Sequence, residues 1–303
     1  MSNGTSIDAR FLREKRPFSN SQIDRLGEFY AGKRSTAPDC QEEIITWYER
    51  LKDETSRLVS HAVHSVGVDG RGPFEIVQSA RVKTRSSIAD KINRGSRLSA
   101  MQDFAGVRFD LGAAHSTLLK IAQVIETSVK QVDAKVTIKN YLSNPQQGYR
   151  AVHVWVTSKT TGRVEIQLRT QLQAEWANTF EKLADLTDRR IRYEDDYRPA
   201  HPVLQSVWEN LLEISGKFYN IEADLEEGYE SAQRGLQSIV ATSRAIPVEP
   251  RIHRDRAKFY INMANYELNL ADTAESNNET LERLRQLQDS LTNLRIESKQ
   301  ING

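Results

Sequence analysis

The sequence predicts an α/β protein of the α+β kind, in which helices cover a mixed, largely antiparallel sheet of five strands. Two patterns support this prediction. Between residues 74 and 190, short segments of alternating apolar and polar residues are interspersed with segments of helical spacing. On both sides of this region, apolar residues recur at three- and four-residue intervals over long stretches, which is typical of helices with one apolar face.

The composition is that of a globular protein, because 38% of the 303 residues are hydrophobic and 27% are charged. No apolar run approaches the roughly 20 residues that a membrane-spanning helix requires. Residues 1–16 lack the apolar centre of a signal peptide. The single cysteine, Cys40, excludes an internal disulfide and a zinc site built from several cysteines. We therefore expect a cytoplasmic protein.

Residues 1–73 are predicted to form an N-terminal helical region. Ser19 to Tyr30 has the features of a short capped helix. A longer helix is expected from about Gln41 to Val66, where apolar residues fall on one face. These residues are Ile44, Ile45, Tyr48, Leu51, Leu58 and Val59. The glycine-rich stretch from Gly67 to Pro73 ends this helix.

Residues 74–190 contain five predicted strands and three predicted helices. The strands are expected at Phe74–Val82, Phe104–Leu111, Ala134–Leu142, Tyr149–Ser158 and Arg163–Thr170. The helices are expected at Ser86–Arg94, Ala114–Val129 and Leu172–Thr187. The last two strands are predicted to form a hairpin that turns at Thr161 and Gly162. These elements together give the mixed sheet covered by helices.

Residues 191–303 are predicted to form a C-terminal helical extension. One long helix is expected from Val203 to Leu225, and Pro247 and Pro250 interrupt the chain after it. Another helix is expected from Phe259 to Leu270, before a stripe of leucines. The stripe consists of Leu284, Leu287, Leu291 and Leu294, with Ile301 in register. Two interpretations are open: an antiparallel hairpin packed on the core, or a surface for a homo-oligomer or an antitoxin-like protein partner.

Basic residues are concentrated near the first predicted strand, although the net charge of the whole chain is only +1. They are Arg81, Lys83, Arg85, Lys91, Arg94 and Arg97. A solvated helix face and a binding site for polyphosphate both explain such a cluster. Alternation along a strand places Arg81 and Lys83 on the same face. A helix that begins near Ser86 adds its N-terminal amides, which also bind anions.

Asp103 stands at the entrance to the second predicted strand, where an unpaired carboxylate is costly to bury. Arg108 on the same strand is its partner in a purely structural interpretation. A magnesium ion beside a triphosphate is the alternative, because Mg²⁺ binds through one or two carboxylates plus phosphates.

The predicted hairpin carries a set of polar side chains, because polar and apolar residues alternate along its strands. The set consists of Glu165, Gln167 and Arg169 on one strand and Tyr149, Arg150 and His153 on its neighbour. A solvated sheet face explains this pattern. A nucleotide site explains it equally well, because an aromatic ring, several cationic or titratable groups and a carboxylate come together on one surface.

These segments together resemble the RelA/SpoT synthetase domain, which long stringent-response enzymes and small alarmone synthetases share. Four motifs of that domain are matched in order over residues 74–190. The matching residues are Arg81, Lys83, Ser87 and Lys91; Asp103, Gly106, Val107 and Arg108; Gly148, Tyr149, Arg150 and His153; and Glu165, Gln167, Arg169 and Thr170. A following helix with Trp and Glu is matched by Trp176 and Glu181. One such motif is a weak indication, whereas four ordered motifs are a strong one.

The resemblance implies a nucleotidyltransferase-like fold and a pyrophosphokinase that moves the β,γ-pyrophosphate of ATP to a nucleotide 3′-hydroxyl. In the implied ATP site, Arg81 and Arg108 stack on either side of the adenine. Lys83 and Lys91 hold the phosphates, and Ser87 belongs to the same site.

The resemblance also implies a metal site and an acceptor site. Asp103 and Glu165 bind Mg²⁺ and are the catalytic pair, and Glu165 helps to deprotonate the attacking hydroxyl. Tyr149 stacks on the acceptor base. The implied acceptor site consists of Tyr149, Arg150, His153, Gln167 and Arg169.

The sequence departs from the family in two respects. The segment Asn144–Gly148 lacks the lysine that many members carry shortly before the G-Y-R motif. This absence weakens the expected binding of the phosphates of GDP or GTP. No His-Asp dipeptide of the family's hydrolase domain occurs, so we expect a synthesis-only enzyme.

Three functions follow as hypotheses. The first is a small alarmone synthetase that makes (p)ppGpp from ATP and GDP or GTP and releases AMP. The second is a toxin-type relative that pyrophosphorylates the 3′ end of tRNA, with Arg189, Arg190 and Arg192 as RNA contacts. The third is a catalytically silent nucleotide- or partner-binding module, against which the presence of both Asp103 and Glu165 counts.

Overall fold

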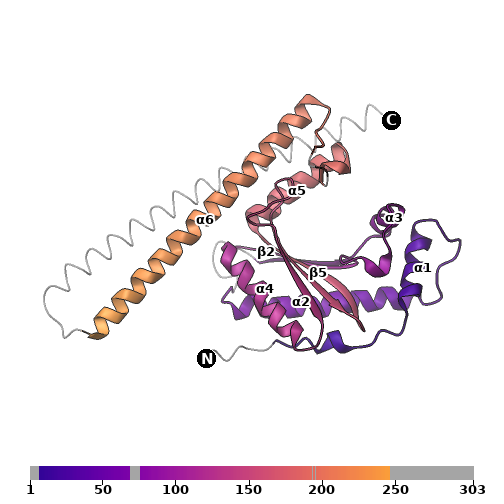
Figure 1. The fold of residues 1–303 in the computed structure, drawn as a ribbon, viewed down its shortest axis with the longest axis horizontal. Helices are drawn as coiled ribbons and strands as arrows, with labels where there is room; N and C mark the ends of the chain where they lie inside the picture. Colours follow the sequence, from indigo (N-terminus) through magenta and orange to yellow (C-terminus); the bar gives the residue numbers. More distant parts are fainter. Residues whose placement is uncertain (1–6, 69–75, 193, 195, 246–303) are drawn as a thin grey trace. The chain divides into compact units, whose positions relative to one another are not determined.

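A five-stranded sheet with the strand order β1-β2-β5-β4-β3 organises the first half of the chain (Figure 1). The computed structural model describes residues 7–68, 76–192, 194 and 196–245. The strands are β1 (Val77–Val82), β2 (Ala105–Leu111), β3 (Lys135–Asn140), β4 (Val152–Ser158) and β5 (Gly162–Thr170). The pairing of β2 with β5 is parallel, and the other three pairings are antiparallel. The predicted mixed, largely antiparallel sheet is therefore confirmed.

Alternation along the strands separates an apolar face of the sheet from a polar face. The buried residues of the three central strands include Val107, Phe109, Val154, Val156, Val164, Ile166 and Leu168. Helices α2 (Gln41–Ser65) and α4 (His115–Lys130) pack against the strands (Figure 1). Their own apolar stripes, such as Ile44 and Leu58 on α2 and Ile121 on α4, are fully or almost fully buried. Burial of each such side chain contributes about 1.5–3 kcal/mol.

Helix α1 (Asn20–Tyr30) packs against the segment that follows β1. It begins with a capping box between Ser19 and Gln22. It packs against α3 (Arg85–Asn93) and the short helix η2 (Leu98–Ala100). Gly27 permits this contact, because a β-carbon at that position would lie 2.8 Å from the Cβ of Leu98.

The chain divides into two compact units. One contains Met1–Asn144 and Ala151–Gln171, and therefore the sheet. The other contains Pro145–Arg150 and Leu172–Gly303. The N-terminal helices belong to the sheet unit because α2 packs directly on the strands. The divisions expected from the sequence at residues 73 and 190 therefore differ from this partition.

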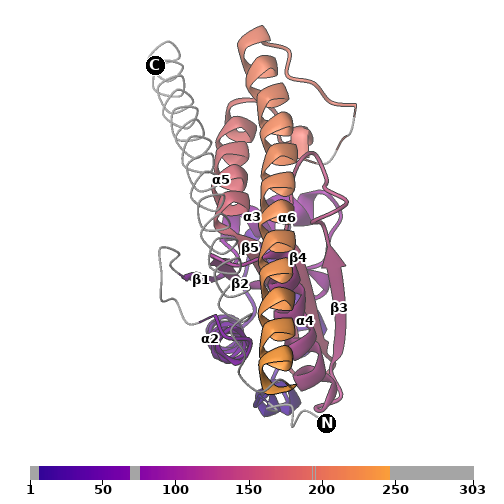
Figure 2. The ribbon, with the colours of Figure 1, turned by 90° about the vertical axis from the view of Figure 1, so that its left-hand side faces the viewer.

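The second unit is built on α5 (Gln171–Leu186) and α6 (Pro202–Ala245), which lie side by side (Figure 2). The short helix η3 (Arg189–Arg192) precedes α6. The apolar cluster of this unit includes Trp176, Phe180, Leu183, Trp208, Leu211 and Phe218. The indole Nε1 of Trp176 donates to the carbonyl of Leu211 at 2.6 Å, which fixes α6 against α5. None of the described helices combines the length and the apolar character that a membrane crossing requires.

One predicted strand boundary is wrong. The strand expected from Tyr149 begins at Val152, and residues 145–150 form a turn that belongs to the other unit. Gln147 and Gly148 both have a positive φ, of 48° and 80°, which a strand does not accommodate. The helix predicted at Phe259–Leu270 and the leucine stripe after it lie outside the described residues, as does the start of the first predicted strand.

Candidate active site

Strand register arranges the polar side chains of the sheet in two neighbouring rows. The first row consists of Arg81, Gly106, Glu165, Trp155 and Thr137. The second row consists of Ser79, Arg108, Gln167, His153 and Lys139. The two rows share one face of the sheet, because side chains two residues apart on a strand point to the same side. Arg81, Arg108, His153, Glu165 and Gln167, all predicted site residues, are thus brought together.

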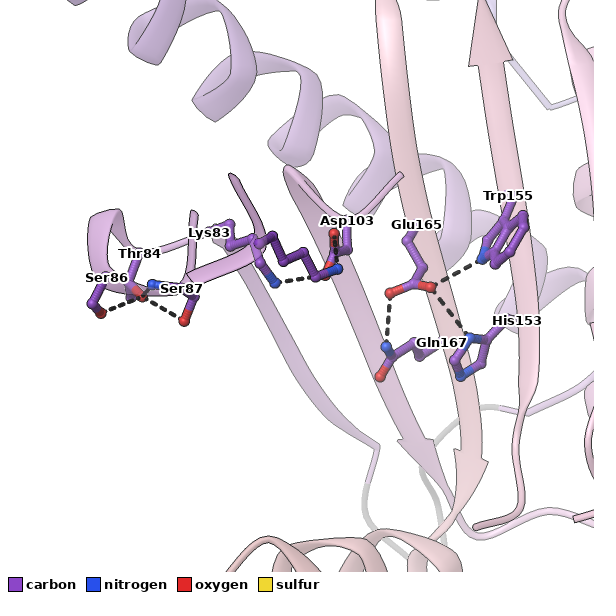
Figure 3. Close-up of polar contacts among 10 residues, drawn as sticks. Lys83, Thr84, Ser86, Ser87, Asp103, His153, Trp155, Glu165 and Gln167 are labelled. Atoms are coloured by element: carbon purple, nitrogen blue, oxygen red, sulfur yellow. Dashed lines mark hydrogen bonds and ion pairs between the residues drawn. The ribbon is translucent and has the colours of Figure 1, made fainter. Parts of the chain in front are cut away.

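Asp103 lies immediately before β2 and is bound by two ammonium groups. The Nζ of Lys83 donates to Oδ2 at 2.6 Å, and the Nζ of Lys91 donates to both carboxylate oxygens at 2.9 Å (Figure 3). Lys83 directly follows β1, and its backbone amide donates to the carbonyl of Phe104, so the two segments stay aligned. Lys91 reaches the same carboxylate from the last turn of α3. The residue that follows β1 and the last turn of α3 therefore converge on Asp103.

The lysines keep Asp103 ionised. Burial alone would raise the pKa of this carboxyl, but the hydrogen bonds and charges of Lys83 and Lys91 outweigh it and leave the pKa below its ordinary value. Of the six basic residues near β1, these two bind Asp103. Arg85 instead lies over the ring of Tyr30, at 5.1 Å from its centroid.

Glu165 is held by three donors from β4 and β5. The Nε1 of Trp155 donates to Oε1 at 3.0 Å, the Nε2 of Gln167 donates to Oε2 at 2.9 Å, and the Nδ1 of His153 lies 3.2 Å from Oε1 (Figure 3). The side chains of His153 and Glu165 are only 12% and 13% exposed. A carboxylate fixed on both oxygens has one orientation, which suits a group that must meet a substrate at a defined place.

Asp103 and Glu165 lie beside each other and interact (Figure 3). Burial would raise the pKa of Glu165, but the hydrogen bond and charge of His153, with the hydrogen bond of Gln167, lower it below its ordinary value. The negative charge of Asp103 acts in the opposite direction and raises it. Burial, together with the charge of Glu165, raises the pKa of Tyr141, whose ring lies nearly perpendicular to that of His153 with 5.2 Å between the ring centroids.

Three predicted ATP-site residues lie at the β1 side of these carboxylates. Arg81 is exposed on β1, and Arg108 is partly exposed on β2 with its Nε 3.4 Å from the amide oxygen of Gln167. Ser87 lies in the first turn of α3, where its hydroxyl and amide bond to the capping residue Thr84. The helix therefore begins one residue earlier than predicted and is capped by Thr84.

Arg169 occupies a different environment from the rest of the predicted acceptor set. Its side chain is only 2% exposed, and its Nε and a terminal nitrogen bind the two oxygens of Asp110 at 2.9 and 3.1 Å. The ion pair joins β5 to β2 inside the fold. A direct contact between Arg169 and an acceptor stays a prediction.

Tyr149 and Arg150 do not lie on β4, where the sequence predicted them. Both belong to the loop 145–150 in the second unit, where Tyr149 packs against the apolar cluster of α5 and α6. The Nε of Arg150 donates to the hydroxyl of Ser215 at 3.1 Å, and its guanidinium lies 4.5 Å from the ring centroid of Tyr219.

Sequence reasoning missed Trp155 and Lys139. Trp155 donates to Glu165, and the Nζ of Lys139 lies 5.5 Å from the ring centroid of Trp155. The two-residue spacing between His153 and Trp155 predicts that they share a face, and this pattern would have been enough to find Trp155.

The charges of the site favour an anionic ligand. Its β1 side carries four cationic side chains and two carboxylates, which leaves an excess of two positive charges. The cations are Arg81, Lys83, Lys91 and Arg108 and the carboxylates are Asp103 and Glu165. Gly106 leaves the sheet surface bare between Arg81 and Glu165, so a ligand can approach the backbone there.

A family model and two mycobacterial proteins match the sequence of this chain. A family model described as the region found in RelA / SpoT proteins matches residues 80–183. The uncharacterized protein Rv1366 of Mycobacterium tuberculosis is 32% identical over 218 residues, which make up 71% of this chain and 76% of that protein. The uncharacterized protein Mb1401 of Mycobacterium bovis has the same identity and coverage.

Among solved structures, small alarmone synthetase 2 from Bacillus subtilis has 19% identity and a TM-score of 0.49, covering 64% of this chain and 100% of that chain. The fold is a mixed sheet of the α+β kind, and its polar face combines two carboxylates with several cationic side chains. On the strength of the family model and the mycobacterial relatives, the chain belongs to the RelA/SpoT family and carries a domain of its synthetase type.

Proposed function

We propose that this protein is an ATP-dependent pyrophosphokinase that transfers the β,γ-pyrophosphate of ATP to the 3′-hydroxyl of GDP or GTP and releases AMP. One observation carries the proposal: Asp103, bound by two lysines, lies beside Glu165, which three donors hold in place. Membership of the RelA/SpoT family supports it. The sequence contains no His-Asp dipeptide, so we propose synthesis without hydrolysis.

The donor nucleotide would occupy the β1 side of the polar face. Lys83 and Lys91 would exchange part of their contact with Asp103 for oxygens of the phosphate chain. Arg81 and Arg108 would hold the adenine, because guanidinium planes stack on aromatic rings. Ser87, in the first turn of α3, would add a donor near the free amides of that helix.

Glu165 would act on the attacking hydroxyl. The 3′-oxygen of the acceptor attacks the β-phosphorus of ATP, so a bond between that oxygen and the β-phosphorus forms. The bond between the β-phosphorus and the oxygen that bridges to the α-phosphorus breaks, and AMP leaves with that oxygen. The hydroxyl proton passes to the carboxylate of Glu165. Positioning and charge neutralisation contribute most of the acceleration in such transfers.

The donor set of the site fits a magnesium ion. Asp103 and Glu165 supply two adjacent ionised carboxylates, and Mg²⁺ is usually bound by one or two carboxylates together with substrate phosphates. When bound, the ion would neutralise charge on the phosphate oxygens. Within the described ranges, no group of three or more His, Cys, Asp or Glu side chains is arranged to hold a metal.

The acceptor would lie on the β4 side of Glu165. His153 and Gln167, which both contact Glu165, would orient the hydroxyl or its neighbouring phosphate. Tyr149 would stack on the acceptor base. Arg150 and Arg169 complete the proposed acceptor set, and each already has a partner inside its own unit.

A tRNA 3′ end is the second candidate acceptor, because the loop Asn144–Gly148 contains no lysine for a nucleotide phosphate chain. The predicted RNA contacts weigh against it. Arg190 pairs with Asp188 at 2.9 Å, and Arg192 pairs with Glu181 at 2.5 Å, so both charges are offset within the fold. GDP or GTP is therefore the acceptor that we propose.

Transfer of label tests the proposal. The protein is incubated with ATP labelled in its two terminal phosphates and with GDP, GTP or deacylated tRNA in turn. We expect label on the guanosine nucleotide, with AMP formed in equal amount, and transfer slowed by a factor of about 10² to 10⁴ with Glu165→Gln. Label on tRNA alone would establish the second candidate. No transfer to any acceptor, with the variant equal to the parent, would leave a binding module.

A further inference from the structure

Helix α6 contacts the loop at residues 145–150, which carries Tyr149. Ser215, Tyr219 and Glu222 fall at positions i, i+4 and i+7 of α6 and therefore on one face. The hydroxyl of Ser215 donates to the carbonyl of Gly148 at 2.5 Å and accepts from the Nε of Arg150 at 3.1 Å. One buried hydroxyl thus joins two residues of the loop to the helix.

The guanidinium of Arg150 points into the helical unit. It lies 4.5 Å from the ring centroid of Tyr219, which is the distance of a cation–π contact. Burial lowers the pKa of Arg150, and the charges of Tyr219 and Glu222 act in the opposite direction. Glu222 is itself only 8% exposed and accepts a hydrogen bond from Gln173 of α5 at 3.1 Å. Arg150 therefore lies near buried polar side chains of α5 and α6, namely Gln173, Ser215 and Glu222.

Gly148 permits the loop to pack so closely. Its φ of 80° is in the left-handed region, and a β-carbon there would lie 2.7 Å from Cζ2 of Trp176 and 3.1 Å from Cδ2 of Leu212. The amide of Tyr149 donates to the carbonyl of Gln146 at 2.8 Å, which closes the turn. Both sides of the loop are fixed by α5 and α6.

We infer that α6 is a positioning element of the acceptor site, and that Ser215 and Tyr219 act through Arg150 to present Tyr149. In this arrangement Arg150 is a positioning residue and does not bind the phosphates of the acceptor. The inference rests on the proposed function in one respect, namely that Tyr149 contacts the acceptor base. It extends the acceptor machinery beyond residues 80–183, the part that matches the family model.

Two variants and a matched control test this inference in the full chain. Ser215→Ala removes the shared hydroxyl, and Tyr219→Leu removes the ring below Arg150. Lys217→Ala is the control, because Lys217 lies on the same helix, is 55% exposed and pairs with the exposed Glu213. Hydrogen exchange of the peptide that spans residues 145–150 reports on the loop whether or not the protein is active. We expect faster exchange in both variants and unchanged exchange in the control.

Kinetics supply the second measurement. Tyr219→Leu should raise the KM for the acceptor about 3- to 30-fold, the range of one cation–π contact. The factor should be the same for GDP and GTP, and the KM for ATP should stay within about 2-fold of the parent. Arg150→Gln combined with Tyr219→Leu should be no worse than the more damaging single change, because both changes break the same contact.

Two results would overturn the inference. One is unchanged exchange of the loop in both Ser215→Ala and Tyr219→Leu. The other is an effect of Arg150→Gln that is larger for GTP than for GDP and additive with Tyr219→Leu, which would make Arg150 a direct phosphate ligand. A parent protein that transfers nothing contradicts the proposed function instead, and the exchange measurement then still decides whether α6 holds the loop.

Discussion

At the scale of single residues, the site depends on two carboxylates that are ionised for different reasons. Asp103 is held by the ammonium groups of two lysines, whereas Glu165 is held by an indole, an amide and an imidazole. We expect these lysines to exchange part of their contact with Asp103 for phosphate oxygens. The partners of Glu165 all lie on the paired strands β4 and β5, and they hold both of its oxygens.

Glu165→Gln should lower the rate of transfer without preventing ATP from binding. An amide cannot accept the hydroxyl proton, and loss of general-base assistance typically costs a factor of about 10² to 10⁴. Glutamine keeps the shape of the side chain, so we expect ATP affinity within a few-fold of the parent. Steady-state kcat and calorimetric titration with a non-hydrolysable ATP analogue measure the two effects. Equal loss of both would mean that Glu165 has a structural role.

Trp155→Phe separates positioning from chemistry at the same carboxylate. The variant keeps an aromatic ring and removes the hydrogen bond to Oε1. One hydrogen bond is worth about 0.5–1.5 kcal/mol, so kcat should fall about 2- to 12-fold. His153 and Gln167 still hold Glu165 in this variant. A loss as large as that of Glu165→Gln would contradict a positioning role for the indole.

Asp103 also makes stability depend on pH. Its pKa in the folded protein is below the ordinary value of 3.8, so the unfolded chain binds more protons in acid. The stability that this group contributes is present above that ordinary value and is lost as the pH falls through the folded pKa. Urea unfolding between about pH 5 and about pH 2 should therefore show a steeper loss for the parent than for Asp103→Asn. Parallel curves would show that the lysines do not stabilise the carboxylate.

At the scale of secondary-structure elements, the turn at residues 145–150 is constrained by two residues of positive φ, Gln147 and Gly148, and by close packing at Gly148. Gly148→Ala should destabilise the protein by about 1–2 kcal/mol for the left-handed backbone and by about 1–3 kcal/mol more for overlap with the ring of Trp176. Chemical denaturation followed by tryptophan fluorescence measures this loss. Trp176 and Trp208 lie in α5 and α6, so their fluorescence change should occur at a lower denaturant concentration in the variant than in the parent.

Gly216→Ala is the control for that substitution. Gly216 lies inside α6, and an added β-carbon there meets no atom within 4 Å. Alanine in a helix interior is more favourable than glycine by about 0.5–1 kcal/mol, so this variant should be slightly more stable than the parent. Similar destabilisation by both alanines would contradict the crowding at Gly148.

The sheet elements were predictable because their pattern is local. Alternation of period two identified all five strands and the face that carries Arg108, His153 and Glu165. The partner of Arg150 was not predictable, because Ser215 lies 65 residues away on a helix that sequence reasoning treated as an extension. The burial of Arg169 was not predictable either, because its partner Asp110 is distant in sequence. The parallel pairing of β2 and β5 brings the two residues together.

At the scale of the whole molecule, the proposed site residues divide between the two compact units. The sheet unit contains Asp103, Glu165 and the cations that we propose for ATP, and the helical unit contains Tyr149 and Arg150. The family match ends at residue 183, whereas α6 runs from Pro202 to Ala245. We therefore expect changes in α6 to affect use of the acceptor more than binding of ATP.

The central claim is that the β,γ-pyrophosphate of ATP moves as one unit to a nucleotide 3′-hydroxyl. Phosphorus NMR of the protein with ATP, GDP and Mg²⁺ tests it most directly. The account predicts that AMP and a guanosine nucleotide with a new 3′-diphosphate form in equal amounts, and that both form about 10²- to 10⁴-fold more slowly with Glu165→Gln. ADP as the product of ATP, or AMP formation that does not depend on an acceptor, would contradict it.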